Sequence, residues 1–370
     1  MARHYLDHAS TSLARPEAVE AMLPWLSFAA DPSRVHTDGR QSRGAVEQAR
    51  EQVAALLGAR PREVVFTSGA TEAIAAAVWG ATERGRHVVV PAVEHSAVRD
   101  ASAAFGEVTE IGVDGMGRVD PDAVLGAVRP GQTGLVHLQW ANHEVGTMQP
   151  AAEVVAGCRT RGVLVHVDAA CAAGHAEVNF PTLGADLMSV SAHKLGGPQG
   201  VGALLVRRGL RLRPLLLGGE QERSRRAGME NVAGIVGFGA ACASLAELLA
   251  DEAARAHTQT DAILAAAAAV EGIVAYGDTR DRVPHLICVG VPGVEAEAVL
   301  LSLDQAGIAA HSGSACSSES LEPSPVLAAM GVEAERSLRL SVGWSTTDGD
   351  VDAFALAFPA VVRRLRSLRA

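Results

Sequence analysis

The sequence predicts an α/β fold, with a large domain built on a mostly parallel sheet covered by helices and a smaller α+β domain toward the C-terminus. Short runs rich in valine and leucine alternate with helical patterns from about residue 61 to residue 208. After about Gly228 a long alanine-rich stretch begins, followed by further strand and helix patterns. With 370 residues, 48% of them hydrophobic, the chain is longer than a usual single domain. We therefore expect a large domain at residues 15–255 and a small domain at residues 1–14 and 256–370.

The strands of the large domain are expected at short apolar runs, which are typical of strands buried on both faces. Helical patterns lie between most of these runs, and residues 44–57 and 151–161 place apolar side chains on one face. This alternation of strand and helix implies a mostly parallel sheet with helices on both faces. The predicted strands are residues 63–66, 87–90, 134–139, 163–167, 187–191 and 201–206.

The small domain follows the alanine-rich stretch at residues 232–269, where we expect helices separated by glycine and charged breaks. Alanine is the best helix former, so the composition favours ordered helix over a low-complexity segment. The later patterns mix strands and helices, which gives the α+β class. They predict strands at residues 285–290, 308–310 and 337–341, and helices near residues 295–303 and 350–368.

The composition argues against several classes of protein. The net charge is −10 and the pI is about 5.7, which is unfavourable for general nucleic-acid binding. A membrane helix needs about 18 consecutive apolar residues, and because the sequence has no such run we expect no membrane span. The N-terminus lacks the apolar segment of a secretion signal, so we expect a cytoplasmic protein.

Cysteine usage distinguishes one residue from the rest. The number of cysteines is odd and no CxxC pair occurs, so we expect neither a disulfide framework nor a metal site. Cys316 lies among small polar residues, where a thiol could become a thiolate and reach a substrate. The alternative for Cys316 is a surface cysteine in a linker. The other cysteines lie in apolar runs and are expected in the core; they are Cys158, Cys171, Cys242 and Cys288.

Two charged side chains follow predicted strands. Lys194 comes after the strand at residues 187–191, and a lysine there could form a Schiff base with an aldehyde cofactor. Asp168 ends the strand at residues 163–167, where a carboxylate could pair with a protonated pyridine nitrogen. The alternatives are a surface lysine, and an aspartate that caps a helix or forms half of a metal pair. Because strand carboxyl ends line the ligand crevice of open α/β sheets, the two side chains could converge.

Three further segments are candidates for the same crevice. Residues 67–72, Thr-Ser-Gly-Ala-Thr-Glu, precede a helix, so their amides and the Thr71 hydroxyl could bind phosphate or form an ordinary N-cap. His95 could stack on a flat ring or carry protons, although a lone histidine is more often structural. Arg339 lies in a strand-like alternation, and a half-buried arginine needs a carboxylate from the protein or from a substrate. Each signal alone is weak, but their joint occurrence is much more specific.

Together these segments resemble the cysteine desulfurases, pyridoxal-phosphate enzymes of the fold-type I, class V aminotransferase group. The segment from Ser312 is similar to the branch with a short catalytic-cysteine loop, which serves iron–sulfur assembly and tRNA thiolation. The resemblance implies a homodimer with active sites near the subunit interface. The segments that carry it run nearly end to end: Tyr5-Leu6-Asp7-His8-Ala9, residues 67–72, Glu94-His95, and residues 166–170, 191–194, 218–223, 312–324 and 339.

The resemblance also implies a role for each candidate residue. L-Cysteine would be the substrate, Lys194 would carry the cofactor, and Cys316 would take the substrate sulfur as a persulfide, leaving L-alanine. A sulfur-acceptor protein or scaffold would then collect the sulfur. The remaining roles are Asp168 at the pyridine nitrogen, His95 stacked on the ring and assisting proton transfer, Arg339 at the substrate carboxylate, and Ala70, Thr71, Ser191 and His193 at the phosphate.

Several positions differ from the pattern of the family. His143 stands where most members have a second asparagine. In the family this residue lies on the side of the cofactor's phenolic oxygen, near the substrate. Cys171 stands where a glutamine usually addresses the same oxygen, and a thiol is a weaker donor. We interpret the two as a paired change in which His143 donates the missing bond. Met229 replaces a threonine that the neighbouring subunit usually contributes to the phosphate site, and residues 73–75 are less polar than usual.

Two other functions stay open. One is a selenocysteine lyase or another carbon–sulfur lyase of the same fold, and the other is a non-catalytic scaffold that binds a sulfur carrier. Cys316 favours desulfuration, because lyases that release free sulfide or selenide need no acceptor thiol. Lys194 argues against a scaffold without chemistry.

Overall fold

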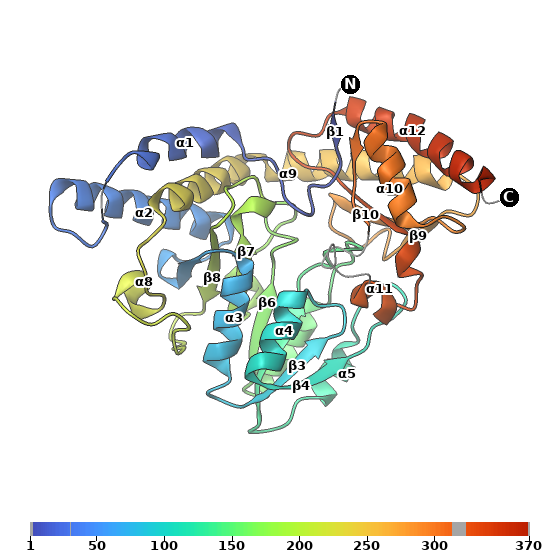
Figure 1. Ribbon diagram of the computed structural model, residues 1–370. Coiled ribbons are helices and arrows are strands. Elements are labelled where there is room, and N and C mark those ends of the chain that lie inside the picture. Colours follow the sequence, from blue (N-terminus) through green and yellow to red (C-terminus); the bar gives the residue numbers. More distant parts are fainter. Residues whose placement is uncertain (1–2, 30, 313–322, 369–370) are drawn as a thin grey trace.

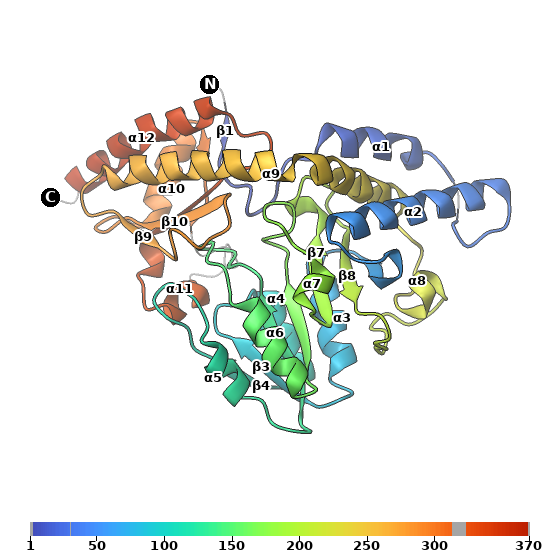
Figure 2. The same cartoon turned by 180° about the vertical axis from the view of Figure 1, so that it is seen from behind.

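The computed structural model describes residues 3–29, 31–312 and 323–368 of the chain. A broad body surrounds a central sheet, and a second group of helices and strands lies beside it (Figures 1 and 2). Helix α9 (Val232–Ala268) runs along both groups. Cys316 lies outside the described residues.

The central sheet has seven strands in the order β2-β8-β7-β6-β5-β3-β4, and every neighbouring pair is parallel except the two that involve β8. The prediction of a mostly parallel sheet is therefore confirmed. β8 is antiparallel because residues 192–201, which include Lys194, give too short a connection from β7 for a crossover. The strands are β2 (Val64–Thr67), β3 (His87–Pro91), β4 (Glu107–Ile111), β5 (Thr133–Gln139), β6 (Leu164–Asp168), β7 (Leu187–Ser191) and β8 (Gly202–Val206).

Helices cover both faces of this sheet, as the alternating pattern predicts. Side chains such as Val65 and Leu135 point to one face and pack under α3 and α4. Side chains such as Val136 and Val167 point to the other face and form the main core with α2, α6 and the first half of α9. These helices are α2 (Thr37–Leu56), α3 (Ala70–Ala81), α4 (Ser96–Phe105) and α6 (Ala151–Thr160).

The sequence pattern does not predict β4. Its residues, Glu-Val-Thr-Glu-Ile, are mostly exposed, because β4 is the edge strand next to β3. Charged side chains are typical of edge strands, since they discourage pairing with another chain. The apolar-run criterion finds buried strands and therefore passes over such an edge.

Helix α9 corrects one expectation. The predicted breaks within residues 232–269 are wrong, because α9 is a single helix of 37 residues. Its glycines are points of close packing instead of breaks. A Cβ at Gly239 would lie 2.6 Å from the Cα of Ala49 in α2, and one at Gly237 would lie 2.6 Å from the side chain of Met22 in α1.

Among the described helices, α9 is the one long and apolar enough to cross a membrane by length and composition. It contacts α1, α2 and α12 along its length. Phe238, Cys242 and Leu245 of its first half are buried in the main core, while Ile263 and Ala267 of its second half are buried in a second core. Contacts of this kind are typical of a core helix in a globular protein.

The second core belongs to the smaller group of elements. β12 (Ser337–Ser341), β10 (Leu286–Gly290) and β9 (Val274–Tyr276) form an antiparallel sheet, and α10 (Ala296–Gln305) and α12 (Asp348–Ser367) pack on it. The division into two domains stays a prediction, and its expected boundary at residue 256 falls inside α9. The remaining elements are β1 (His4–Tyr5), β11 (Ile308–Ala309), α1 (Pro16–Leu26), α5 (Pro121–Gly126), α7 (Phe180–Leu183), α8 (Gln221–Ser224), α11 (Pro325–Ala329), and the 3-10 turns η1 (Pro61–Glu63), η2 (Ala192–Lys194) and η3 (Ala334–Arg336).

Candidate active site

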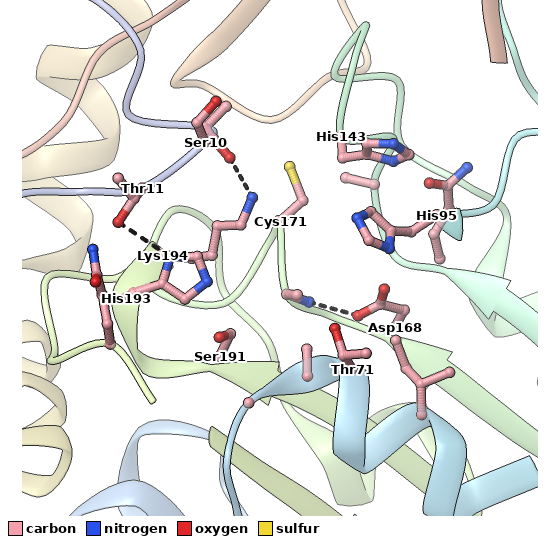
Figure 3. A pocket seen from close by; sticks show the side chains of 18 of the residues that line it. Ser10, Thr11, Thr71, His95, His143, Asp168, Cys171, Ser191, His193 and Lys194 are labelled. Carbon is pink, nitrogen blue, oxygen red and sulfur yellow. Dashed lines mark hydrogen bonds between the residues drawn. The ribbon is translucent and has the colours of Figure 1, made fainter. Parts of the chain in front are cut away.

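A cavity of about 520 Å³ opens at the carboxyl ends of the central strands, beside the start of α3. It brings together every described residue that the sequence marks as a candidate, as Figure 3 shows for most of them. These residues come from separate strand ends, from α3 and from the small sheet. They are Ala70, Thr71, His95, His143, Asp168, Cys171, Ser191, His193, Lys194 and Arg339.

Lys194 ends the 3-10 turn that follows β7, and its side chain enters the cavity. Its Nζ donates a hydrogen bond to the carbonyl oxygen of Ala9, and its own carbonyl accepts one from Nε2 of His175 at 3.0 Å. Burial lowers the pKa of the Lys194 amine, and the positive charge of Arg339 adds to the effect. A lysine held in this way is more readily the neutral nucleophile that Schiff-base chemistry needs.

Asp168 is the last residue of β6 and is almost fully buried. Its Oδ1 accepts hydrogen bonds from the Ser189 hydroxyl at 2.8 Å and from the backbone N–H of Ala170 at 3.0 Å. The bond from Ala170 resembles the capping interaction that is an alternative for this residue. The same carboxyl group also lines the cavity, so the capping contact is compatible with the chemical interpretation, which stays a prediction.

The start of α3 forms a cradle of the kind that binds anions. The N-cap is Gly69, and Ala70 and Thr71 of the first turn line the cavity. Glu72 points away: its Oε2 accepts the N–H of Ser68 at 2.8 Å, and its Oε1 accepts Nε of Arg226 at 2.8 Å. Burial opposes ionisation of this carboxyl, but Arg226 and Ser68 lower its pKa overall.

Glycine is required where β8 passes this cradle. A Cβ at Gly202 would lie 2.6 Å from the carbonyl oxygen of Val190 and 2.7 Å from the Cα of Gly69. The missing side chain therefore lets β8 approach both β7 and the start of α3. Ser191, which follows Val190 and lines the cavity, is held next to the cradle as a result.

His95 has a structural role as well as a place in the cavity. It is the N-cap of α4, and its Nδ1 accepts the N–H of Ala97 at 3.1 Å. Because Nδ1 is an acceptor, the neutral ring carries its proton on Nε2. The ring lies edge-to-face with that of His143, with centroids 5.1 Å apart. His95 can therefore offer or move a proton through Nε2.

Two of the positions that differ from the family pattern, His143 and Cys171, line the cavity. Burial lowers the pKa of His143 well below its ordinary value, with further contributions from His95 and Lys194, so the imidazole is neutral. Burial raises the pKa of Cys171 to about 11, which keeps this thiol protonated. The Sγ of Cys171 lies 3.8 Å from the carbonyl oxygen of Asn142. The thiol is therefore directed to the backbone, and it is a poor nucleophile.

Arg339 is 1% exposed, so the expectation of a half-buried arginine is wrong. One face of β12 packs on the small core through residues such as Leu338, and the other face is closed by the cavity wall. Nη2 of Arg339 donates to Asp7 Oδ1 at 2.9 Å and to the Ser10 hydroxyl at 2.5 Å, and Nη1 donates to the carbonyl of His143 at 3.1 Å. In this state its carboxylate partner is a protein side chain.

The N-terminal segment contributes residues that the sequence patterns do not mark. Ala9, Ser10 and Thr11 line the cavity, and Thr11 Oγ1 lies 3.2 Å from Nδ1 of His193. Burial, with the nearby Lys194, lowers the pKa of His193 to about 4, so this ring is neutral. The family-like segment at residues 5–9 is the sequence signal that could have pointed to them.

Cys316 lies outside the described residues, but both flanks of its segment are described. On one side the backbone of His311 pairs with that of Arg339, whose N–H donates to the His311 carbonyl at 2.7 Å. On the other side the Ser324 hydroxyl donates to Oε2 of Glu144 at 2.5 Å. Arg339 lines the cavity, and Glu144 directly follows His143, which also lines it, so both described flanks lie beside the cavity. Within the described part of the chain, no group of three or more His, Cys, Asp or Glu side chains could hold a metal ion.

Comparison with known proteins agrees with this geometry. The profile of the aminotransferase class-V family matches residues 4–354. The chain belongs to this family. A cysteine desulfurase of Trichormus azollae is 43% identical over 98% of this chain and 94% of its own length. Its cysteine desulfurase group is therefore also the group of this chain, as the sequence motifs indicate.

Solved structures of the family share the whole architecture. A NifS-like protein has a TM-score of 0.91 and 30% identity, covering 98% of this chain and 100% of its own. The structure described as SspA in complex with cysteine has a TM-score of 0.81 and 29% identity, covering 92% and 98%. The predicted fold-type I architecture is thus confirmed.

Membership of the family implies dependence on pyridoxal phosphate. The residues present fit that cofactor, because one cavity contains a partly buried lysine amine, a carboxylate at a strand end and the N-terminus of a helix of 12 residues.

Proposed function

We propose that this chain is a pyridoxal-phosphate-dependent desulfurase that converts L-cysteine to L-alanine and stores the sulfur as a persulfide on Cys316. The convergence of Lys194, Asp168 and Arg339 in one cavity, beside both flanks of the Cys316 segment, is the observation that carries the proposal. Two relatives support the substrate: one is named a cysteine desulfurase and the other is described in complex with cysteine.

The cofactor would be held from three sides. Lys194 would bond its aldehyde carbon, and its lowered pKa favours the neutral amine for that step. Asp168, whose carboxylate is held by hydrogen bonds from Ser189 and Ala170, would accept a hydrogen bond from the protonated pyridine nitrogen. When bound, pyridoxal phosphate withdraws electrons from the α-carbon of the substrate. The phosphate would lie against Ala70, Thr71, Ser191 and His193, with His95 stacked on the ring.

The substrate would be oriented by Arg339, whose guanidinium can share its donors between Asp7 and the α-carboxylate. His95 would move protons through Nε2, because Nδ1 is occupied by Ala97. The Cys316 thiolate would attack the substrate sulfur, forming the S–S bond of a persulfide as the C–S bond breaks. The carbon fragment then gains a proton and leaves as L-alanine, so the reaction requires no external oxidant.

Reconstitution with pyridoxal phosphate tests this proposal. We expect alanine from L-cysteine, with sulfide released when an added thiol reduces the persulfide, and far less alanine from Cys316→Ala. Alanine from neither protein would reject the assignment. Equal amounts of alanine from both proteins would remove Cys316 from its role and favour the carbon–sulfur lyase alternative.

We further propose a cytoplasmic homodimer that transfers its sulfur to an acceptor protein or scaffold. Large apolar side chains are exposed on the α1 side and in the loop before α8, for example Leu23 at 58%, Leu26 at 66% and Leu217 at 80%. Leu23 and Leu26 lie about one turn apart on α1, and adjacent exposed apolar side chains are typical of a protein interface. Analytical ultracentrifugation at micromolar concentration would give the mass of a dimer, and a monomer would contradict the proposal.

A further inference from the structure

Glu94 is a buried carboxyl group that the proposed mechanism does not use. It lies in the connection between β3 and α4, directly before His95, and it is 1% exposed. Its Oε1 accepts the backbone N–H of Gln139, at the end of β5, at 2.6 Å. Its Oε2 is enclosed and has no hydrogen-bond partner within the described chain. A buried carboxylate oxygen without a donor is costly, whereas a neutral carboxylic acid in the same place costs much less.

A second carboxyl group lies close to Glu94. β5 is flanked by β3 and β6, and Gln139 of β5 is in register with Asp168 of β6. Glu94 therefore contacts the residue that pairs with Asp168. Asp168 accepts two hydrogen bonds on Oδ1, from a hydroxyl and from an N–H, whereas Glu94 accepts one in total. Of the two, Asp168 is the group better able to carry the negative charge.

The electrostatics of the site agree with this order. Burial is the largest effect that raises the pKa of Glu94 well above its ordinary value, and the charge of Asp168 adds to it. The N–H of Gln139 opposes both effects without overcoming them. Two neighbouring buried carboxyl groups cannot both ionise cheaply, so one of them remains protonated.

Val93, the residue before Glu94, also holds parts of the cavity wall. The carbonyl of Val93 accepts Nε2 of Gln139 at 2.9 Å and Nδ2 of Asn142 at 3.2 Å. Asn142 in turn accepts the N–H groups of the two residues that follow His143. The residues before His95 therefore fix both the end of β5 and the turn that carries His143.

We propose that Glu94 is a positioning residue that acts as a neutral carboxylic acid, fixing the end of β5 and leaving Asp168 as the carboxylate that faces the cofactor nitrogen. This role rests on the proposed function, because Asp168 needs a pyridine nitrogen as its partner. The protonation of Glu94, by contrast, is a property of the folded chain and can be measured without any reaction.

Infrared difference spectroscopy on the full chain tests the protonation near neutral pH. We expect the carbonyl band of a protonated carboxylic acid in the wild-type protein, and loss of its intensity in Glu94→Gln. Glu107→Gln, which changes an exposed glutamate of β4, is the matched control and should leave the band unchanged. A wild-type spectrum without the band, or a band that Glu94→Gln leaves intact, would overturn the proposal.

Titration with pyridoxal phosphate tests the positioning role. Glu94→Ala loses the bond to Gln139, and we expect cofactor affinity to fall about tenfold. Glu94→Gln keeps an acceptor for Gln139 and is neutral, so it should restore both the affinity and the pH dependence of the bound cofactor's visible absorbance. If Glu94 were ionised, Glu94→Gln would remove a negative charge beside Asp168 and shift that pH dependence. If the wild-type protein and both variants failed to bind the cofactor, the proposed function would be contradicted. The infrared result on the protonation of Glu94 would still hold, because it does not depend on the cofactor.

Discussion

Among single residues, Lys194 is the most direct test of the cavity, because its amine is the group expected to bond the cofactor. We expect Lys194→Ala to retain its fold, since the backbone carbonyl that binds His175 remains. Borohydride should fix pyridoxal phosphate to the wild-type protein and not to the variant, as measured by the mass of the peptide that contains residue 194. Alanine formation should fall at least about a hundredfold.

The guanidinium of Arg339 leads to a second prediction at this scale. Its fork contacts Asp7, Ser10 and His143 and could also present paired N–H groups to a substrate carboxylate. Arg339→Lys replaces the fork by a point charge, so we expect the KM for L-cysteine to rise roughly 10- to 100-fold while kcat changes less.

Arg336→Lys is the control for this prediction. Arg336 belongs to the same part of the chain, but it pairs with the exposed side chain of Glu333 at 2.9 Å. This change should leave the kinetics as they are. An unchanged KM in Arg339→Lys would show that Arg339 only holds its protein partners Asp7, Ser10 and His143.

The residue types of the site are predictable from sequence, but many of their partners are not. Every described candidate lines one cavity. The places of Lys194, Asp168 and Thr71 at strand ends and a helix start predict this convergence, and the resemblance to the family adds most of the other candidates. The contact between Arg339 and Asp7 joins residues far apart in the chain, and no local pattern indicates it. The enclosure of Glu94 likewise depends on the pairing of β3, β5 and β6, which the sequence leaves open.

At the scale of elements, the packing of α9 on α2 gives a prediction with a matched pair of variants. A Cβ at Gly239 of α9 would lie 2.6 Å from Cα of Ala49, and that backbone cannot move aside easily. We expect Gly239→Ala to destabilise the protein by about 1–3 kcal/mol. Gly44, in the exposed face of α2, has nothing within 4 Å of such a Cβ, so Gly44→Ala should stabilise by about 0.5–1 kcal/mol.

Urea denaturation of both variants measures the two effects. The midpoint should fall for Gly239→Ala and rise for Gly44→Ala, with an unchanged slope. Equal shifts in the same direction would mean that helix propensity, not close packing, decides the role of the glycines in α9.

The elements that sequence reasoning finds and misses differ in burial. Strands such as β7 and β12 are buried at every residue and lie where the apolar runs predict. β4 is an exposed edge, so its composition carries no such signal. In α9 the sequence predicts breaks that the structure does not have. A glycine in a helical pattern can mark either a break or a close contact, and which of the two applies depends on the neighbouring helix.

For the molecule as a whole, buried histidines tie stability to pH. Burial lowers the pKa of His8, at 1% exposure, and of His166, at 0%, from 6.5 to about 4. Burial also lowers the pKa of His137 and His285 well below the ordinary value. At His8 and His166 the unfolded chain binds protons as pH falls through about 6.5, while the folded chain does not until about 4. Their contribution to stability is therefore complete above pH 6.5 and is lost between pH 6.5 and about 4.

We expect the free energy of unfolding to fall steeply across that interval, with at most about 3 kcal/mol from a single site such as His8. The Ser12 hydroxyl lies 2.8 Å from Nδ1 of His8. His8→Asn keeps a polar amide near this hydroxyl and removes the imidazole that titrates. Urea denaturation at several pH values should then give a shallower acid loss for His8→Asn than for the wild-type protein. His257→Gln, at a side chain 51% exposed, should keep the wild-type slope. An identical slope in all three proteins would mean that the buried imidazoles do not govern acid stability, and that the carboxyl groups do.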